Sequence, residues 1–307
     1  MVTTSADDGV RQRGQSTDVR RGERFAFGEN WDRFLRVLTD ERIAAAERSL
    51  REMLEVDDLR GQRFLDVGSG SGLFSLAARR LGARVRSFDY DATSVMCTAE
   101  LKRRHYGNDA DWTVDRGSVL DRRYLELLGA YDVVYAWGVL HHTGAMWQAF
   151  ENVTTLVAPG GRLFLAVYND QGAWSSRWRR IKRLYCSGPL GRAVVCATWI
   201  PAVVARDLAA DLVWRRNPVK RYTEYKRTRG MSVVHDWIDW LGGYPFEVAK
   251  PEQVFAFFRD CGFTLQRMKT CGGSVGCNEF VFRRPSTKGR ADVGDYDTDA
   301  DELMSRT

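Results

Sequence analysis

Short apolar runs alternate with longer amphipathic segments through the middle of this 307-residue chain. Residues 64–67 form a run typical of a buried strand, and residues 73–81 repeat apolar side chains at helical spacing until Gly82 ends the helix. Similar units continue to residue 169, and a further helix and strands follow residue 250. The alternation predicts an α/β fold built on an open sheet.

The segments around this core have a different composition. Both ends are polar, the C-terminal one is rich in acids, and both are predicted to be loose tails. The stretch after strand five is far longer than a usual connection. The expected parts are a tail (1–22), an N-terminal helical cap (23–60), the core (61–169), a large helical insertion (170–250), a return to the core (251–284) and an acidic tail (285–307).

Composition excludes several protein classes. The N-terminal stretch has no apolar run typical of a secretory signal, and no run of ~18 apolar residues predicts a transmembrane helix. The six cysteines contain no C-x-x-C pair, so neither a zinc site nor a disulfide framework is expected. These features predict a cytoplasmic protein with free thiols. The oligomeric state stays open.

The glycine-rich turn after the first strand carries the first chemical signal. In "LDVGSGSG" the glycines follow a G-x-G-x-G pattern, whereas a dinucleotide site needs G-x-G-x-x-G and has Leu73 in the third place here. Asp66 ends the strand beside the turn. A carboxylate there is awkward beside a pyrophosphate but suits a ligand with a cationic end, such as the amino group of a methionine moiety.

In its context, "LDVGSGSG" resembles the first motif of class I S-adenosylmethionine (SAM) dependent methyltransferases. Four more motifs follow in the family's order: "RVRSFDYD", "DRGSVLD", "YDVVYAWGVLHHTG" and "LVAPGGRLFLAVY". "PEQVFAFFRDCGFTLQRMKT" and "CNEFVFRR" resemble the closing hairpin of the family. The resemblance implies a doubly wound, seven-stranded mixed sheet of the Rossmann-like methyltransferase fold, with the last strand antiparallel, and SAM as the cofactor.

The resemblance also implies the cofactor contacts. Asp89, about 20 residues after the glycines, is the acid that accepts both ribose hydroxyls, and Tyr90 lies along the adenine. Ser118 and Val119 would meet the adenine edge, with Asp121 a nearby substitute because many relatives carry an acid in place of Ser118. The expected cofactor-binding residues are Trp31, Asp66, Gly68, Ser69, Gly70, Gly72, Asp89, Tyr90, Ser118, Val119 and Trp137.

Two of these contacts come from outside the glycine turn. Trp137, at the end of strand four, would flank the methionine part of SAM. Trp31 belongs to an aromatic cluster before the cap, in a place where ubiquinone-biosynthesis O-methyltransferases carry a tryptophan-rich entry segment near SAM. A hydrophobic staple that holds the cap on the sheet is an equally good interpretation of Trp31.

The chain has four histidines, and two of them, His141 and His142, are adjacent after strand four. A metal site would need further ligands at suitable spacing, but His105 and His235 are isolated in sequence, so no metal is expected. One of the pair is expected to face the substrate, as a general base or as wall, while the other braces the loop. His235 in the insertion and Asn169 after strand five are the other catalytic candidates.

The insertion carries the basic excess of the chain. Residues 170–230 hold 14 Lys and Arg against 4 Asp and Glu, whereas the whole chain has a net charge of +6. Its apolar helix is expected to be broken by Pro201. Three interpretations stay open: the apolar parts pack on the core beneath a solvated basic face, the basic face binds an acidic substrate or nucleic acid, or the insertion makes peripheral contact with a membrane.

Together these observations predict a SAM-dependent methyltransferase acting on a small-molecule acceptor in specialised metabolism. O-methylation is favoured, with N- or C-methylation as alternatives. The rival hypotheses are an RNA methyltransferase that uses the basic insertion, which is not favoured because no known RNA-binding module is visible, and a non-catalytic SAM-binding scaffold protein. Transfer of a different group from SAM, or cyclisation of SAM itself, is a further alternative.

Overall fold

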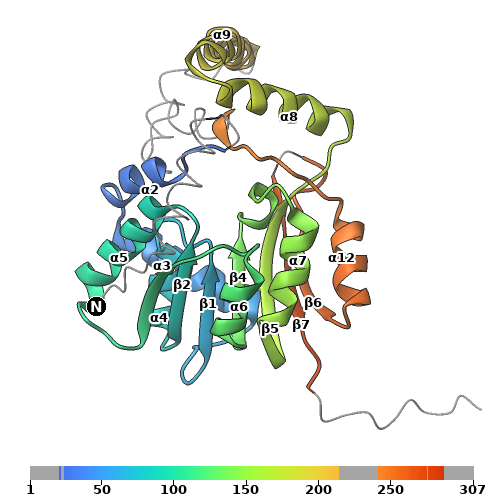
Figure 1. The fold of residues 1–307 in the computed structure, drawn as a ribbon. Helices are drawn as coiled ribbons and strands as arrows, with labels where there is room; N and C mark the ends of the chain where they lie inside the picture. The colour runs from blue at the N-terminus through green and yellow to red at the C-terminus, as the bar shows by residue number, and fades with distance from the viewer. Residues whose placement is uncertain (1–20, 22–23, 214–240, 275, 287–307) are drawn as a thin grey trace, which may run out of the picture.

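The computed structural model describes residues 21, 24–213, 241–274 and 276–286, and its centre is a seven-stranded mixed sheet (Figure 1). The strands are β1 (Arg63–Val67), β2 (Arg84–Asp89), β3 (Trp112–Arg116), β4 (Tyr131–Trp137), β5 (Val157–Tyr168), β6 (Thr264–Lys269) and β7 (Cys277–Arg283). Their order is β3-β2-β1-β4-β5-β7-β6, and β7 runs antiparallel to both neighbours. The predicted fold class is therefore confirmed.

Helices cover both faces of the sheet (Figure 1). One face is covered by α3 (Asp40–Leu54), α4 (Leu73–Arg80) and α5 (Ala92–Tyr106), and the other by α6 (Arg122–Leu128), α7 (Met146–Thr155) and α12 (Pro251–Asp260). Alternate side chains of β4 divide between these layers. Val133 and Tyr135 pack toward the first layer, Val134 and Ala136 toward the second. Both faces of the strand are buried, which explains its nearly continuous apolar sequence.

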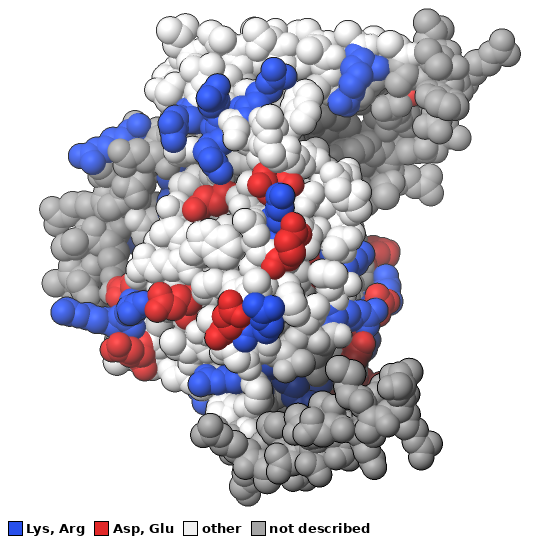
Figure 2. Space-filling model, turned by 90° about the vertical axis from the view of Figure 1, so that its right-hand side faces the viewer, with Lys and Arg blue, Asp and Glu red and all other residues white. Residues whose placement is uncertain are grey.

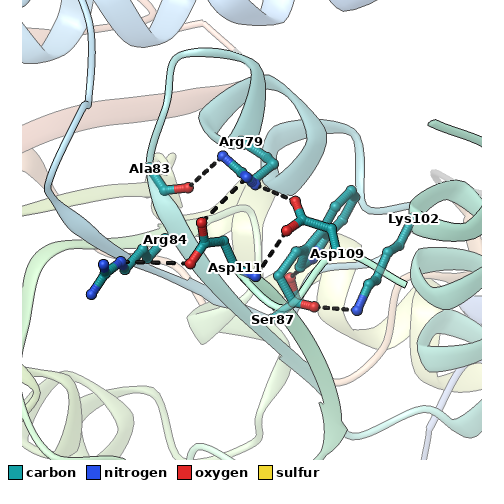
Figure 3. Close-up of polar contacts among 8 residues, drawn as sticks. Arg79, Ala83, Arg84, Ser87, Lys102, Asp109 and Asp111 are labelled. Atoms are coloured by element: carbon teal, nitrogen blue, oxygen red, sulfur yellow. Dashed lines mark hydrogen bonds and ion pairs between the residues drawn. The ribbon is translucent and has the colours of Figure 1, made fainter. Parts of the chain in front are cut away.

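An ion-pair network fixes the free edge of the sheet next to β3 (Figure 3). Arg79 of α4 places Nε 2.6 Å from Asp109, and its guanidinium also contacts Asp111 at 3.4 Å and the carbonyl of Ala83 at 3.5 Å. The side chains of Arg79 and Asp109 are largely buried, so this pair is better shielded from solvent than an ordinary surface ion pair. The network joins α4 to the loop between α5 and β3.

The N-terminal cap reaches over the carboxyl ends of the strands. Helix α2 (Gly28–Leu35) packs beside α5, and the Gly28 N–H donates to Asp91 at 3.1 Å. Asp91 also caps α5 by accepting from the Thr93 N–H. One carboxylate therefore ties α2 to the start of α5, above the end of β2.

The described part of the insertion is a helical arm of two helices, α8 (Ala173–Cys186) and α9 (Pro189–Val213). The prediction that Pro201 breaks the apolar helix is wrong, because α9 continues through it. Pro201 removes one backbone N–H, but both Pro201 and Ala197 four residues before are exposed, so water can satisfy the carbonyl that loses its donor. None of the described helices is long and apolar enough to cross a membrane.

Candidate functional site

A cavity of about 440 Å³ lies where the carboxyl ends of β1, β2 and β4 meet. Open α/β sheets bind ligands at this edge. Among the residues expected from sequence, those that line it are Trp31, Asp66, Gly68, Ser69, Gly70, Asp89, Tyr90, Ser118, Val119, Trp137 and His142. Side chains from six separate segments therefore converge on one pocket.

Two glycines allow the backbone after β1 to pass close to its neighbours. Gly68 has φ +71°, and a Cβ there would lie 2.4 Å from Val139 in the loop after β4. Gly70 has φ +55°, and a Cβ there would lie 2.9 Å from the ring of Trp31. Both the positive φ and the missing space therefore require glycine. Trp31 lies directly over the glycine turn, so it is a cavity wall as well as part of the cap.

Asp89 ends β2 with its carboxylate held by backbone donors. Its oxygens accept from the Gly70 N–H at 2.9 Å and the Asp91 N–H at 2.8 Å. Desolvation nevertheless raises the pKa of Asp89 to about 6, with the charge of Asp91 acting in the same direction. Each carboxylate oxygen has a second lone pair, so Asp89 can accept hydroxyl donors from a ligand in the cavity.

Asp66 places a second carboxyl group at this end of the cavity. It is 2 % exposed and accepts from the Ser75 hydroxyl at 2.5 Å, while Ser75 and Ser87 are 2.7 Å apart. The pKa of Asp66 is raised to about 7. Desolvation is the main cause, and the nearby charge of Asp89 acts in the same direction. A nearby cation would stabilise the ionised forms of both carboxyl groups. This end of the cavity therefore favours a cationic group.

Arg24 is a cavity residue that the sequence analysis missed. Its guanidinium donates to the carbonyls of His142 and Thr143 at 3.1 and 3.3 Å and lies 5.0 Å from the centre of the Tyr90 ring. The residue thus joins the chain before α2 to the loop after β4, and it stacks where an adenine is expected. A single arginine next to a polar tail gives no periodic or motif signal, so no sequence rule could have selected it.

The two histidines occupy different environments. They belong to the 3₁₀ turn η1 (Leu140–His142), and their ring centres are 4.3 Å apart. His142 faces the cavity, and its Nδ1 lies 2.7 Å from the carbonyl of Pro245. A carbonyl only accepts, so Nδ1 carries the proton and Nε2 keeps its lone pair. Burial lowers the pKa of His142 to about 3, so the ring is neutral at physiological pH.

His141 lies behind its neighbour. It is 0 % exposed, its ring centre is 4.2 Å from that of Tyr168, and its ring nitrogens make no well-aligned hydrogen bond to the described residues, although the backbone of Ala166 lies close enough to favour the protonated ring. Burial lowers the pKa of His141 well below its usual range, and the charges of His142 and Lys182 act the same way. His141 therefore packs as a neutral aromatic ring.

Three other expected residues do not line the cavity. Gly72 lies against Thr98 at the start of α4. Asn169 accepts from the side chain of Asn278 at 3.0 Å, and its own backbone N–H donates to Gly276, which places it at the end of β5. The Asp121 side chain accepts from the Tyr124 N–H and so caps the start of α6. His235 lies outside the described residues.

The described residues contain no group of three or more His, Cys, Asp or Glu side chains that could hold a metal ion. The six cysteines carry free thiols. The residues that line the cavity offer carboxylates, one neutral imidazole, backbone groups and aromatic walls.

Comparison with known proteins places this site in a family. Residues 36–215, more than half of the chain, match the family model described as "Methyltransferase domain". The ubiquinone biosynthesis O-methyltransferase of Burkholderia thailandensis is 33% identical over 111 residues, which is 36% of this chain and 46% of that protein. The same enzyme of Xanthomonas euvesicatoria pv. vesicatoria is 36% identical over 112 residues, or 36% and 45%. The match spans less than half the length of these relatives.

A solved structure confirms the fold. An O-methyltransferase family protein from Burkholderia thailandensis superposes with a TM-score of 0.52 at 16% identity, covering 93% of this chain and 75% of that one. At this identity the likeness concerns the fold alone.

The raised pKa of Asp66 predicts how stability changes with pH. Its pKa is about 7 in the folded chain against 3.8 in a model compound, so between pH 4 and 7 the folded state binds the extra proton. The contribution of Asp66 to the free energy of unfolding therefore falls as pH rises through that range. We expect the change in the free energy of unfolding between pH 5 and pH 8, measured by urea unfolding, to be less negative by about 1–3 kcal/mol in Asp66→Asn than in the wild type.

Asp109→Asn is the matched control. The hydrogen bond from Arg79 lowers the pKa of Asp109, so this carboxyl group stays ionised between pH 5 and pH 8. This variant is expected to leave the change between pH 5 and pH 8 as in the wild type. Equal pH dependence in Asp66→Asn and the wild type would show that Asp66 ionises normally.

Proposed function

This chain belongs to the methyltransferase-domain family of class I, SAM-dependent enzymes, and we propose that it transfers the methyl group of SAM to a small-molecule acceptor, with oxygen as the favoured attacking atom. The observation that supports this most strongly is the combination of a glycine turn with two carboxylates of raised pKa, Asp66 and Asp89, in one cavity. SAM supplies an electrophilic methyl group on a positively charged sulfur.

The cavity residues fit this cofactor by their chemistry. The glycine turn offers backbone that a ligand can approach closely, because no Cβ stands at Gly68 or Gly70. Asp89 would accept the ribose hydroxyls, and Asp66 would favour the ammonium and sulfonium charges. Phe27, Trp31 and their neighbours in the cap provide apolar walls that exclude water from the reacting centre.

Methyl transfer depends mainly on holding the acceptor close to the methyl group and in line with the bond that breaks. Among the described histidines, His142 is the one that lines the cavity, and its Nε2 lone pair can take the proton of an acceptor hydroxyl. His141 then acts as a positioning residue, because its ring packs on that of His142. We keep Asn169 and His235 as candidates for orienting the acceptor from outside the described cavity.

We expect Asp89→Ala to weaken SAM binding by about 1–3 kcal/mol, roughly 5- to 150-fold, because the ribose hydroxyls and two backbone N–H groups lose their acceptor. Isothermal titration calorimetry with SAM measures this. Glu126→Ala, at an exposed position of α6, is the control and should bind as the wild type does. Affinity within about twofold of the wild type in Asp89→Ala would remove the basis for the cofactor assignment.

The acceptor class is tested with SAM labelled in its methyl group. The protein is incubated with an extract of its source cells, and organic-soluble small molecules are separated from macromolecules. We expect label among the small molecules, and less label when Asp89→Ala replaces the wild type at the same limiting concentration of SAM. Label confined to a nuclease-sensitive fraction would replace this proposal with RNA methylation, and absence of any label would favour a non-catalytic SAM-binding protein.

The role proposed for His142 is tested once an acceptor is known. A general base contributes roughly 10²- to 10⁴-fold when its pKa lies near the working pH. Because burial lowers the pKa of His142 to about 3, its ring is a weaker base, and we expect His142→Gln to lower kcat by about 10-fold with little change in the KM for SAM. Since the pKa of His142 is about 3, its protonation should cause no loss of rate between pH 5 and pH 8.

His141→Phe is the matched control, because it keeps an aromatic ring and removes two nitrogens that make no well-aligned hydrogen bond to the described residues. It should retain kcat within about threefold. If His142→Gln also retains kcat to that degree, His142 is a wall residue.

A further inference from the structure

The arm of α8 and α9 stands away from the sheet, with α9 on the outside of the molecule (Figure 1). Helix α8 packs inward through Trp178, Lys182 and Tyr185, and its Trp178 ring lies against Trp199 of α9 at 6.2 Å. One face of α9 is therefore used for packing on α8. The opposite face needs a separate explanation.

The outer face of α9 is an apolar stripe. Its members recur at helical spacing and are exposed: Leu190, Val194, Ala197, Pro201 and Leu208. Leu190 is 79 % exposed and Val194 is 47 % exposed, although Val195 beside them is 4 % exposed. No charged residue occurs between positions 193 and 205, so this stretch of α9 places no charge at the surface. Contiguous exposed apolar residues of this kind mark an interaction site.

Positive charge surrounds the stripe. The described arm, residues 173–213, contains six arginines, the buried Lys182 and two acids, Asp207 and Asp211. Arg192 and Arg206 stand at the two ends of the uncharged stretch, and Arg177 and Arg180 are exposed on α8. Figure 2 shows Lys and Arg gathered on the upper part of the molecule, where Figure 1 places the arm, with Asp and Glu below them.

We propose that the arm docks on the surface of an anionic lipid bilayer, with the apolar stripe of α9 among the acyl chains and the flanking arginines at the lipid phosphates. An apolar stripe bordered by arginine, on a helix that is not long and apolar enough to span, is the pattern of a helix that lies in the membrane interface. This inference does not depend on the identity of the acceptor or on the proposed catalytic residues.

Charge and polarity favour this occupant over two others. A symmetric contact between two copies would bring one arm against another, and each arm carries six arginines against two acids, of which Asp211 is buried. RNA would neutralise the arginines, but it would leave Leu190 and its apolar neighbours in water. A bilayer with acidic headgroups satisfies both the charge and the apolar stripe.

The test uses the full chain and sedimentation with two kinds of vesicle, phosphatidylcholine alone and an equal mixture with phosphatidylglycerol. We expect binding to the mixed vesicles that weakens as salt is raised, and much weaker binding to the neutral ones. The double variant Leu190→Glu/Val194→Glu should lose at least ~10-fold in binding to the mixed vesicles. In this variant two aliphatic side chains that would enter the acyl chains are replaced by carboxylates, which have the same sign of charge as the lipid phosphates.

Leu127→Glu is the matched control, because Leu127 is 83 % exposed on α6, outside the arm. It should bind vesicles as the wild type does, and SAM affinity unchanged in the double variant would show that it remains folded. The proposal is overturned if the wild type ignores both vesicles, if the double variant binds as well as Leu127→Glu, or if binding is equal on neutral vesicles. It is also overturned if the stripe variant instead dissociates a dimer or abolishes RNA binding.

Discussion

The close approach of backbone at Gly68 and Gly70 is the constraint on which the rest of the site depends. Because neither residue has a Cβ, Val139 from the end of β4 and Trp31 from the cap can both contact the same turn. Segments separated by about 100 residues in sequence therefore enclose one cavity. The same turn presents the Gly70 N–H to Asp89, so the conformation that makes room for a ligand also orients the acid at the end of β2.

This convergence has an energetic cost. Burial raises the pKa of both Asp66 and Asp89, and the charge of Asp89 further disfavours the ionised form of Asp66. Backbone N–H groups and the Ser75 hydroxyl offset part of the cost but leave both pKa values raised. A structure selected for stability alone would place neutral groups here. The retained carboxylates are better explained by a cationic ligand, whose charge would stabilise their ionised forms.

The core was predictable because its information is local. Strand runs, amphipathic helices and the glycine turn each follow from a few neighbouring residues, so the sheet and the glycine turn with its two carboxylates could be expected from sequence. Arg24 could not, because its importance arises from carbonyls about 118 residues away. Which histidine faces the cavity also depends on a distant contact, that of His142 with Pro245. Pro201 misled the prediction because solvent exposure, which a sequence does not state, decides whether proline breaks a helix.

Helix α8 gives the arm a second relation to the site. Lys182 on its inner side is 1 % exposed, lies 5.0 Å from the ring of Phe246, and has a pKa that burial lowers to about 7, although the sequence analysis counted it only as part of the basic excess of the insertion. Phe246 packs on Tyr168, and Tyr168 packs on His141. Continuous side-chain contacts therefore lead from α8 to the histidine pair. In the proposed arrangement one helix separates the bilayer surface from this wall of the cavity, which favours acceptors with an apolar portion that concentrates at a membrane.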